Sequence, residues 1–200
     1  MNKLTKKEKD KLNIKGKFDT LFIHDIENTI GYKRPDHGQK SYFFNLLRKL
    51  DKELGVKDND LVVIAGNKKL IEKANNIYYE DTPCKEIIFP AGGKDGADLK
   101  LLASVQRLYS SNQLSQFKKV VIVSGDNIFS SWARTLTRLG INVETISLRE
   151  NACREFRISN SHKYLKNLFE RDERWNVTCV WGGIGSSNDK LARGKEGDVF

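Results

Sequence analysis

Residues 119–126 read KVVIVSGD, in which four β-branched apolar residues are followed by a serine, a glycine and an aspartate. A continuous apolar run of this length is typical of a parallel strand that is buried on both faces. Gly125 permits a tight turn directly after the run. The segment therefore predicts a buried strand that ends in a polar loop carrying Ser124 and Asp126.

Similar short apolar runs occur on both sides of this segment, and amphipathic helical segments separate them. The predicted strands are TLFIHD (20–25), LVVIAG (61–66), EIIFP (86–90, ended by Pro90), INVETIS (141–147) and VTCVWGG (177–183). Strands that alternate with helices pair in parallel through right-handed crossovers. We therefore expect a Rossmann-like α/β fold, a three-layer α/β/α sandwich with a mainly parallel central sheet.

The intervening segments have helical spacing of apolar residues. The helices are expected at 41–54, 68–79, 97–111 and 128–139, with further helical segments around residues 150–170. In the third of these, the spacing places Leu99, Leu102, Val105 and Leu108 on one helical face.

Length and composition predict a single domain. The chain has 200 residues, of which 38% are hydrophobic, enough for one sizeable core. Residues 1–17 hold seven lysines and are expected to form a basic N-terminal arm, either flexible or a short helix. The domain is expected to span 18–182, followed by a flexible, glycine-rich tail at 183–200.

The charge balance favours a polyanionic partner. Lys and Arg number 35 against 26 Asp and Glu, a formal net charge of +9. Such an excess suits nucleic acid, although a soluble protein with a lysine-rich surface has the same balance. The three cysteines show no CxxC spacing, which argues against a zinc site or a disulfide framework. No apolar run approaches the roughly 20 residues of a membrane span, so we expect a cytoplasmic protein with no membrane partner.

Polar residues follow two of the predicted strands. Asp25 ends the first, with Glu27 and Asn28 close behind it, and Ser124 and Asp126 follow the strand at 119–123. In open parallel sheets, ligands bind outside the carboxyl ends of the strands. A carboxylate there can bind a divalent metal, and each aspartate can equally serve as a helix or turn cap.

A third acidic segment, GGKDGAD, precedes the helix expected at 97–111. Its Asp95 and Asp98 lie where a helix N-terminus favours acids for structural reasons, and Lys94 places a cation beside them. If Asp25, Asp98 and Asp126 converge on one cleft, their mutual repulsion calls for a cation such as Mg²⁺ or Mn²⁺.

These motifs together resemble the NYN family of PIN-like ribonucleases. HDIEN is similar to the family's D-x-x-N signature, GGKDGADLKLL to its K-G-x-D-x-x-L element, and the segment beginning VVIVSGDNIF to its S-G-D strand and helix; the match runs from about residue 20 to about residue 169. The resemblance implies a PIN-like fold and Mg²⁺- or Mn²⁺-dependent (endo)ribonuclease activity, which leaves a 5′-phosphate and a 3′-hydroxyl. It also implies that Asp25, Asp98 and Asp126 are catalytic metal ligands, that Asn28 supports them, and that Ser124 contacts them or a phosphate.

The chain departs from the family pattern at two places. Ile128 stands where many relatives have a second aspartate, which favours one tightly bound metal and leaves Glu27 or Asp95 as substitute acids. One extra residue separates Lys94 from Asp98, so the position of Lys94 relative to the acids is open.

Basic residues suggest where RNA would lie. Lys33, Arg34 and Lys40, with Tyr32 and His37 among them, suit a single-stranded backbone and a stacked base, or form an ordinary solvated loop. Arginines further along the chain can extend such a track or be ordinary surface charge; these are Arg134, Arg138, Arg149, Arg154 and Arg157. His24 precedes Asp25 and is expected on the opposite face of its strand, in a structural role.

Two other functions compete with the ribonuclease. A PIN-like RNA-binding module with weakened catalysis is favoured by Ile128 and opposed by the three aspartates. A phosphohydrolase or nucleotide-binding protein lacks its expected motifs, since the chain has no G-x-G-x-x-G after the first strand, no P-loop and no D-x-D-x-T run. Single-stranded DNA remains an alternative substrate, and a homodimer or another protein is one way to complete the cleft.

Overall fold

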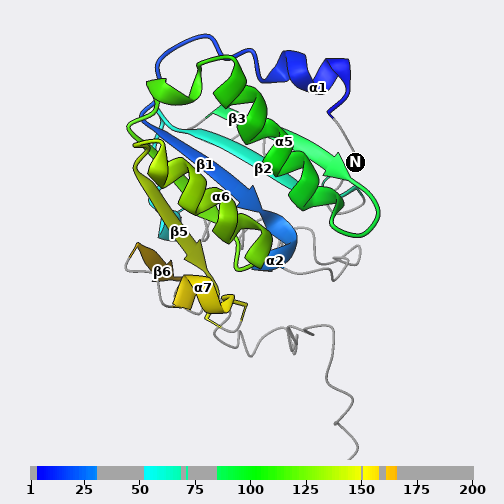
Figure 1. The fold of residues 1–200 in the computed structure, drawn as a ribbon. Helices are drawn as coiled ribbons and strands as arrows, with labels where there is room; N and C mark the ends of the chain where they lie inside the picture. The colour runs from blue at the N-terminus through cyan, green and yellow to red at the C-terminus, as the bar shows by residue number, and fades with distance from the viewer. Residues whose placement is uncertain are drawn as a thin grey trace, which may run out of the picture. The chain divides into compact units, whose positions relative to one another are not determined.

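The computed structural model describes residues 4–30, 52–68, 71, 85–149, 151–157 and 161–165. Within them lies a six-stranded, all-parallel sheet with the strand order β3-β2-β1-β4-β5-β6 (Figure 1). The predicted parallel α/β fold is thus confirmed. The chain divides into two units, residues 1–170 and 171–200, and every described element belongs to the first. The strands are β1 (Thr20–Asp25), β2 (Leu61–Asn67), β3 (Lys85–Ala91), β4 (Lys119–Val123), β5 (Val143–Ser147) and β6 (His162–Tyr164).

Two longer helices cover one face of the sheet. They are α5 (Gly96–Ser110) and α6 (Asn127–Arg138), which lie side by side across the strands in Figure 1. Leu101 and Val105 of α5 and Phe129 of α6 pack with Ile23 and Ile122 of the sheet in one buried cluster. None of the described helices is long and apolar enough to cross a membrane. The shorter helices are α1 (Lys6–Lys11), α2 (Ile26–Ile30), the 3₁₀ helix η1 (Leu114–Gln116) and α7 (Arg154–Arg157).

The strand order creates a reversal point between β1 and β4. From β1 the chain adds β2 and then β3 on one side, and it returns to place β4 on the other side of β1. Residue pairing along β1 matches His24 with Ile64 on β2 and with Val123 on β4. The carboxyl ends of β1 and β4 therefore meet where the crossovers diverge, which is where ligands bind in sheets of this kind.

The structure differs from the sequence expectations in two elements. β3 continues past Pro90 to Ala91, which an edge strand tolerates because the missing N–H faces away from its neighbour. The prediction of helical structure around residues 150–170 is wrong at His162–Tyr164, which form β6 beside β5; α7 is confined to Arg154–Arg157. Three residues are too few for hydrophobic periodicity to reveal a strand. The expected strand at 177–183, the tail at 183–200 and most of the segments 41–54 and 68–79 lie outside the described residues.

Candidate functional site: an acid pair at the reversal point

Asp25 lies at the end of β1, with both carboxylate oxygens held by the protein. Its Oδ1 accepts hydrogen bonds from the backbone N–H groups of Glu27 (3.1 Å) and Asn28 (3.3 Å). Its Oδ2 accepts from the hydroxyl of Ser124 at 3.1 Å. Asp25 is only 4% exposed. The side chain is therefore fixed in one orientation between α2, which follows β1 directly, and the loop after β4.

Asn28 links α2 to the loop after β4, and Ser124 orders that loop from within. The backbone N–H of Gly125 donates to Asn28 Oδ1 at 2.8 Å, and the N–H of Asp126 donates to Ser124 Oγ at 3.2 Å. Sequence analysis predicted supporting roles for both polar residues, and the structure brings both to Asp25. They act here as positioning groups, because each satisfies backbone or carboxylate atoms of the neighbouring loop.

A third loop, after β5, closes this arrangement through Asn151. Its side-chain amide donates to the backbone carbonyl of Asn28 at 2.7 Å, and the N–H of Cys153 donates to the carbonyl of Gly125 at 2.8 Å. Sequence analysis did not select Asn151. An amide in a loop carries no local signal, and only the adjacency of β4 and β5 places it beside the site.

Gly125 is required by the closeness of this third loop. A Cβ built at Gly125 would lie 2.2 Å from the carbonyl oxygen and 2.5 Å from the carbonyl carbon of Asn151. Backbone cannot move away as the end of a side chain can. We therefore expect Gly125→Ala to destabilise the protein by about 2 kcal/mol or more, a fall in Tm of about 4 °C or more.

Thermal denaturation of Gly125→Ala beside Gly92→Ala tests this expectation. A Cβ at Gly92 would meet no atom within 4 Å, so this second variant should melt close to the wild type. Equal melting temperatures for the two variants would contradict the close approach of the loops.

Asp98, in the first turn of α5, completes a pair of buried acids with Asp25. It is 8% exposed, and its carboxyl group shares a hydrogen bond with that of Asp25. Burial raises the pKa of Asp25 to about 8, and the charge of Asp98 adds to the rise. Burial likewise raises the pKa of Asp98 to about 6, with further contributions from Asp126, Asp95 and Glu27. Near neutral pH the two carboxyl groups therefore hold about one proton between them.

Asp126 caps the N-terminus of α6, and its negative charge also acts on the acid pair. Its Oδ1 accepts from the N–H of Ile128 at 3.1 Å, and the residue is exposed. The capping role considered in the sequence analysis is thus present, and the charge of Asp126 also acts on Asp98. Ile128 is half-buried and packs against the hydrophobic core, a contact that an aspartate at this position would lose.

The two charged residues of the turn before α5, Lys94 and Asp95, are not part of the acid pair. Asp95 is exposed at the N-cap position with a left-handed backbone (φ 56°) and makes no capping hydrogen bond with its side chain. Lys94 is exposed beside it and forms no ion pair with any described residue. The sequence left the position of Lys94 open; among the described residues it pairs with neither Asp25 nor Asp98, and its role in substrate binding stays a prediction.

The acid pair suits a hard divalent cation in its chemistry. Two buried carboxyl groups in contact, with the charges of Asp126 and Glu27 nearby, provide oxygen donors and a negative field. As they lie, no three acidic, histidine or cysteine side chains of the described residues surround a common point that a metal ion could occupy. Asp25 and Asp98 are the residues that would hold a cation, and the charge of Asp126 would reinforce them.

His24 has a structural environment. It is fully buried, and its Nε2 lies 2.8 Å from the hydroxyl of Thr29 on α2. Its Nδ1 has no hydrogen-bond partner, and burial lowers the pKa of the imidazole to about 3. The ring is therefore neutral and holds α2, the helix that carries Asn28, against β1.

The basic residues predicted to bind RNA are only partly placed. Lys33 and Arg34, with the rest of their loop, lie outside the described residues. Arg134 and Arg138 are exposed on α6 and line a cavity of about 430 Å³ beside Phe156. Arg157 is tied to the carbonyl of Ala152 at 2.8 Å.

Comparison with known proteins adds no relative. No protein-family model matches the chain, and no curated protein has a significantly similar sequence. The resemblance to NYN ribonucleases therefore depends on the three motifs alone.

Proposed function

We propose that the chain is a Mg²⁺- or Mn²⁺-dependent ribonuclease that hydrolyses phosphodiester bonds of single-stranded or structured RNA. One observation supports this most: Asp25 and Asp98 form a buried acid pair at the reversal point of a parallel sheet, with the pKa of both raised. Burying two acidic side chains together destabilises the folded protein, so folding stability does not explain the pair. A divalent cation bound during function accounts for the arrangement.

In this mechanism Asp25 and Asp98 hold the cation and Asp126 adds negative charge on the solvent side. Bound metal would lower the pKa of a water molecule and stabilise charge on the phosphate. Ser124 and the backbone of α2 fix the Asp25 carboxylate, so that side chain would already be oriented for a cation. The net charge of +9 favours RNA as the polyanionic substrate.

A second candidate is an RNA-binding module that has kept the fold and lost catalysis. It is favoured by the packing of Ile128 against the core at the position of a family acid and by the lack of a ready three-ligand group among the described residues. Both candidates predict RNA binding, and only the ribonuclease predicts cleavage.

Removal of metal separates the two candidates. We expect the wild type to cleave a pool of single-stranded and structured RNA in Mg²⁺ or Mn²⁺ and not in EDTA. Without a metal ion, the acidic side chains do not activate a water molecule for attack on the phosphate. An Asp126→Asn preparation purified in the same way controls for contaminating nucleases, and single-stranded DNA tests the breadth of the substrate. Salt-sensitive RNA binding with no cleavage in either metal would establish the binding module instead.

A further inference from the structure

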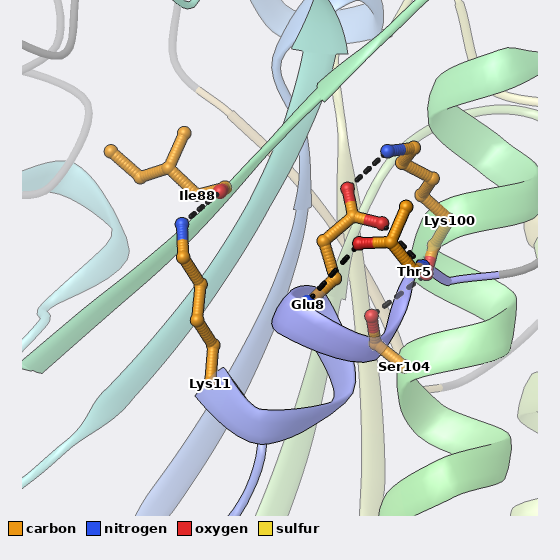
Figure 2. Close-up of polar contacts among 6 residues, drawn as sticks. All are labelled: Thr5, Glu8, Lys11, Ile88, Lys100 and Ser104. Carbon is orange, nitrogen blue, oxygen red and sulfur yellow. Dashed lines mark hydrogen bonds and ion pairs between the residues drawn. The ribbon is translucent and has the colours of Figure 1, made fainter.

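The lysine-rich N-terminal segment is firmly attached to the domain. From the sequence, a flexible arm or a short helix was predicted here. Residues 6–11 form the helix α1, which begins with a capping box between Thr5 and Glu8. The N–H of Glu8 donates to Thr5 Oγ1 (3.3 Å) and the N–H of Thr5 donates to Glu8 Oε2 (2.8 Å), as Figure 2 shows. Leu4, Leu12 and Ile14 are buried in the main core cluster. The segment therefore folds as part of the domain.

Polar contacts orient α1 against the helix that carries Asp98. Glu8 forms an ion pair with Lys100 of α5, and Lys11 Nζ donates to the carbonyl of Ile88 on β3 at 3.5 Å (Figure 2). Burial opposes ionisation of Glu8, yet its hydrogen bonds from Lys100 and Thr5 prevail and lower its pKa. Lys100 follows Asp98 by two residues, about 3 Å along the helix axis. α1 is thus fastened beside the turn of α5 that supplies the acid pair.

These contacts leave a set of lysines on the outer side of the segment. We call them the basic ridge: Lys6, Lys7, Lys9, Lys15 and Lys17, all exposed. None of the five forms an ion pair with a described residue, and the one exposed acid between residues 4 and 17 is Asp10. Since Glu8 is buried and already neutralised by Lys100, it does not offset the ridge. The outer side of α1 therefore carries a clear excess of positive charge.

We propose that the basic ridge is a second contact surface for the RNA phosphate backbone, separate from the acid pair. The proposal rests on the ribonuclease or RNA-binding function for its substrate class. Closely spaced, unpaired ammonium groups release condensed counterions when they meet successive phosphates. Because the core contacts already order the segment, little backbone entropy is lost on binding.

An anionic membrane is the other polyanionic surface to consider, and the ridge lacks the features it requires. Helices that lie in a membrane interface present large apolar side chains toward the lipid. Every large apolar residue of the described segment, Leu4, Leu12 and Ile14, points into the core. The exposed large apolar side chains of the described chain are Tyr109, Leu139 and Tyr164, none of them on α1. The ridge therefore offers contacts to phosphate groups and no apolar side chain that could insert into lipid, which suits RNA better than a membrane.

The test uses two triple variants with the same change of charge. Lys6→Gln/Lys7→Gln/Lys9→Gln removes three ridge cations, and glutamine keeps helix propensity. Lys52→Gln/Lys57→Gln/Lys118→Gln removes three exposed cations outside the ridge, which precede β2 and β4; of these, Lys118 forms an ion pair with Asp19. Binding of a fluorescent RNA of about 30 nucleotides is measured by anisotropy in EDTA over a series of salt concentrations.

The ridge variant is expected to bind at least about tenfold more weakly at low salt. The slope of log K against log salt should become shallower by about 2, because each lost single-strand phosphate contact contributes about 0.7. The control variant should change both quantities much less. Equal changes in the two variants, or no RNA binding by the wild type, would overturn the proposal. So would ridge-dependent binding to phosphatidylserine vesicles with unchanged RNA binding.

This measurement is independent of catalysis. Ridge-dependent RNA binding without cleavage in Mg²⁺ or Mn²⁺ would reject the ribonuclease and retain the ridge. Metal-dependent cleavage with an unaltered salt slope in the ridge variant would do the reverse.

Discussion

Asp126→Asn is expected to reduce RNA cleavage about a hundredfold or more while leaving the fold and RNA binding intact. The substitution removes a negative charge that acts on Asp98. It keeps an oxygen that can accept the hydrogen bond from the N–H of Ile128, and asparagine caps helices as well as aspartate does. Affinity for RNA should be equal or better, since one charge that repels phosphate is gone. Cleavage rates in Mg²⁺ and Mn²⁺, with a melting curve, measure both effects.

Asp126→Ala separates the charge from the cap. It should lose cleavage to the same extent and also lose about 1 kcal/mol of stability, because Ile128 N–H is left without its capping partner. Cleavage at the wild-type rate by Asp126→Asn would show that Asp126 is only a cap. A large fall in Tm for Asp126→Asn would show that its charge serves the fold.

The second large effect concerns pH and metal. In metal-free buffer, the free energy of unfolding is expected to fall as the pH rises from about 6.5 to about 9. The native pKa values of Asp98 and Asp25 are raised to about 6 and about 8. The folded state therefore binds more protons than the unfolded state across this interval, and the stability conferred by proton binding is lost as those protons leave. At about pH 8 Asp25 is still half protonated, so the loss from these two groups is complete only near pH 9.

Divalent metal should reverse that loss. At about pH 8, Mg²⁺ or Mn²⁺ in large excess should raise Tm by about 5 °C or more, and at about pH 5.5 much less, because protons then compete for the same oxygens. Urea denaturation across the pH range gives the free energies. The carboxyl groups of Glu8, Asp19 and Glu144 have lowered pKa values, so their contributions are lost only on acidification and do not enter this window. Burial lowers the pKa of His24 and His162, so these two groups make stability rise with pH up to about 6.5 and oppose the acid pair only below the window.

Asp98→Asn is the matched control for this prediction. Without the charge of Asp98, the pKa of Asp25 should move down, the pH dependence should flatten, and added metal should stabilise little. A wild type whose Tm is unchanged by both metals at pH 8 would contradict a cation site at the acid pair.

The strands and the residues at their ends were the predictable part of this structure. Apolar runs such as LVVIA (61–65) and VVIV (120–123) have no polar residue that could face solvent, so burial on both faces of a parallel sheet followed directly. The topology then brings the end of β1 next to the end of β4, and with them Asp25, Ser124 and Asn28. Their catalytic roles stay predictions, as does the family.

The features that escaped prediction depend on packing between distant segments. On α5 the fully buried face contains Leu101, Ser104 and Val105, whereas Leu99 and Leu102 are half-buried; a search for large apolar residues overlooks a small serine in the contact. Asn151 reaches the site only because β5 adjoins β4. The attachment of α1 depends on Glu8 meeting Lys100, a pair separated by 92 positions in the chain.

The strand order also places Asp25 and the lysines of α1 in different parts of the domain. β1 lies inside the sheet with a neighbour on each side. Local unfolding is therefore expected to reach the backbone that carries Asp25 last. α1 lies outside the sheet, and its polar contacts are with α5 and β3. The exposed lysines of the basic ridge can therefore change during evolution without disturbing the acids, so that in the proposed ribonuclease RNA affinity and catalysis can be selected independently.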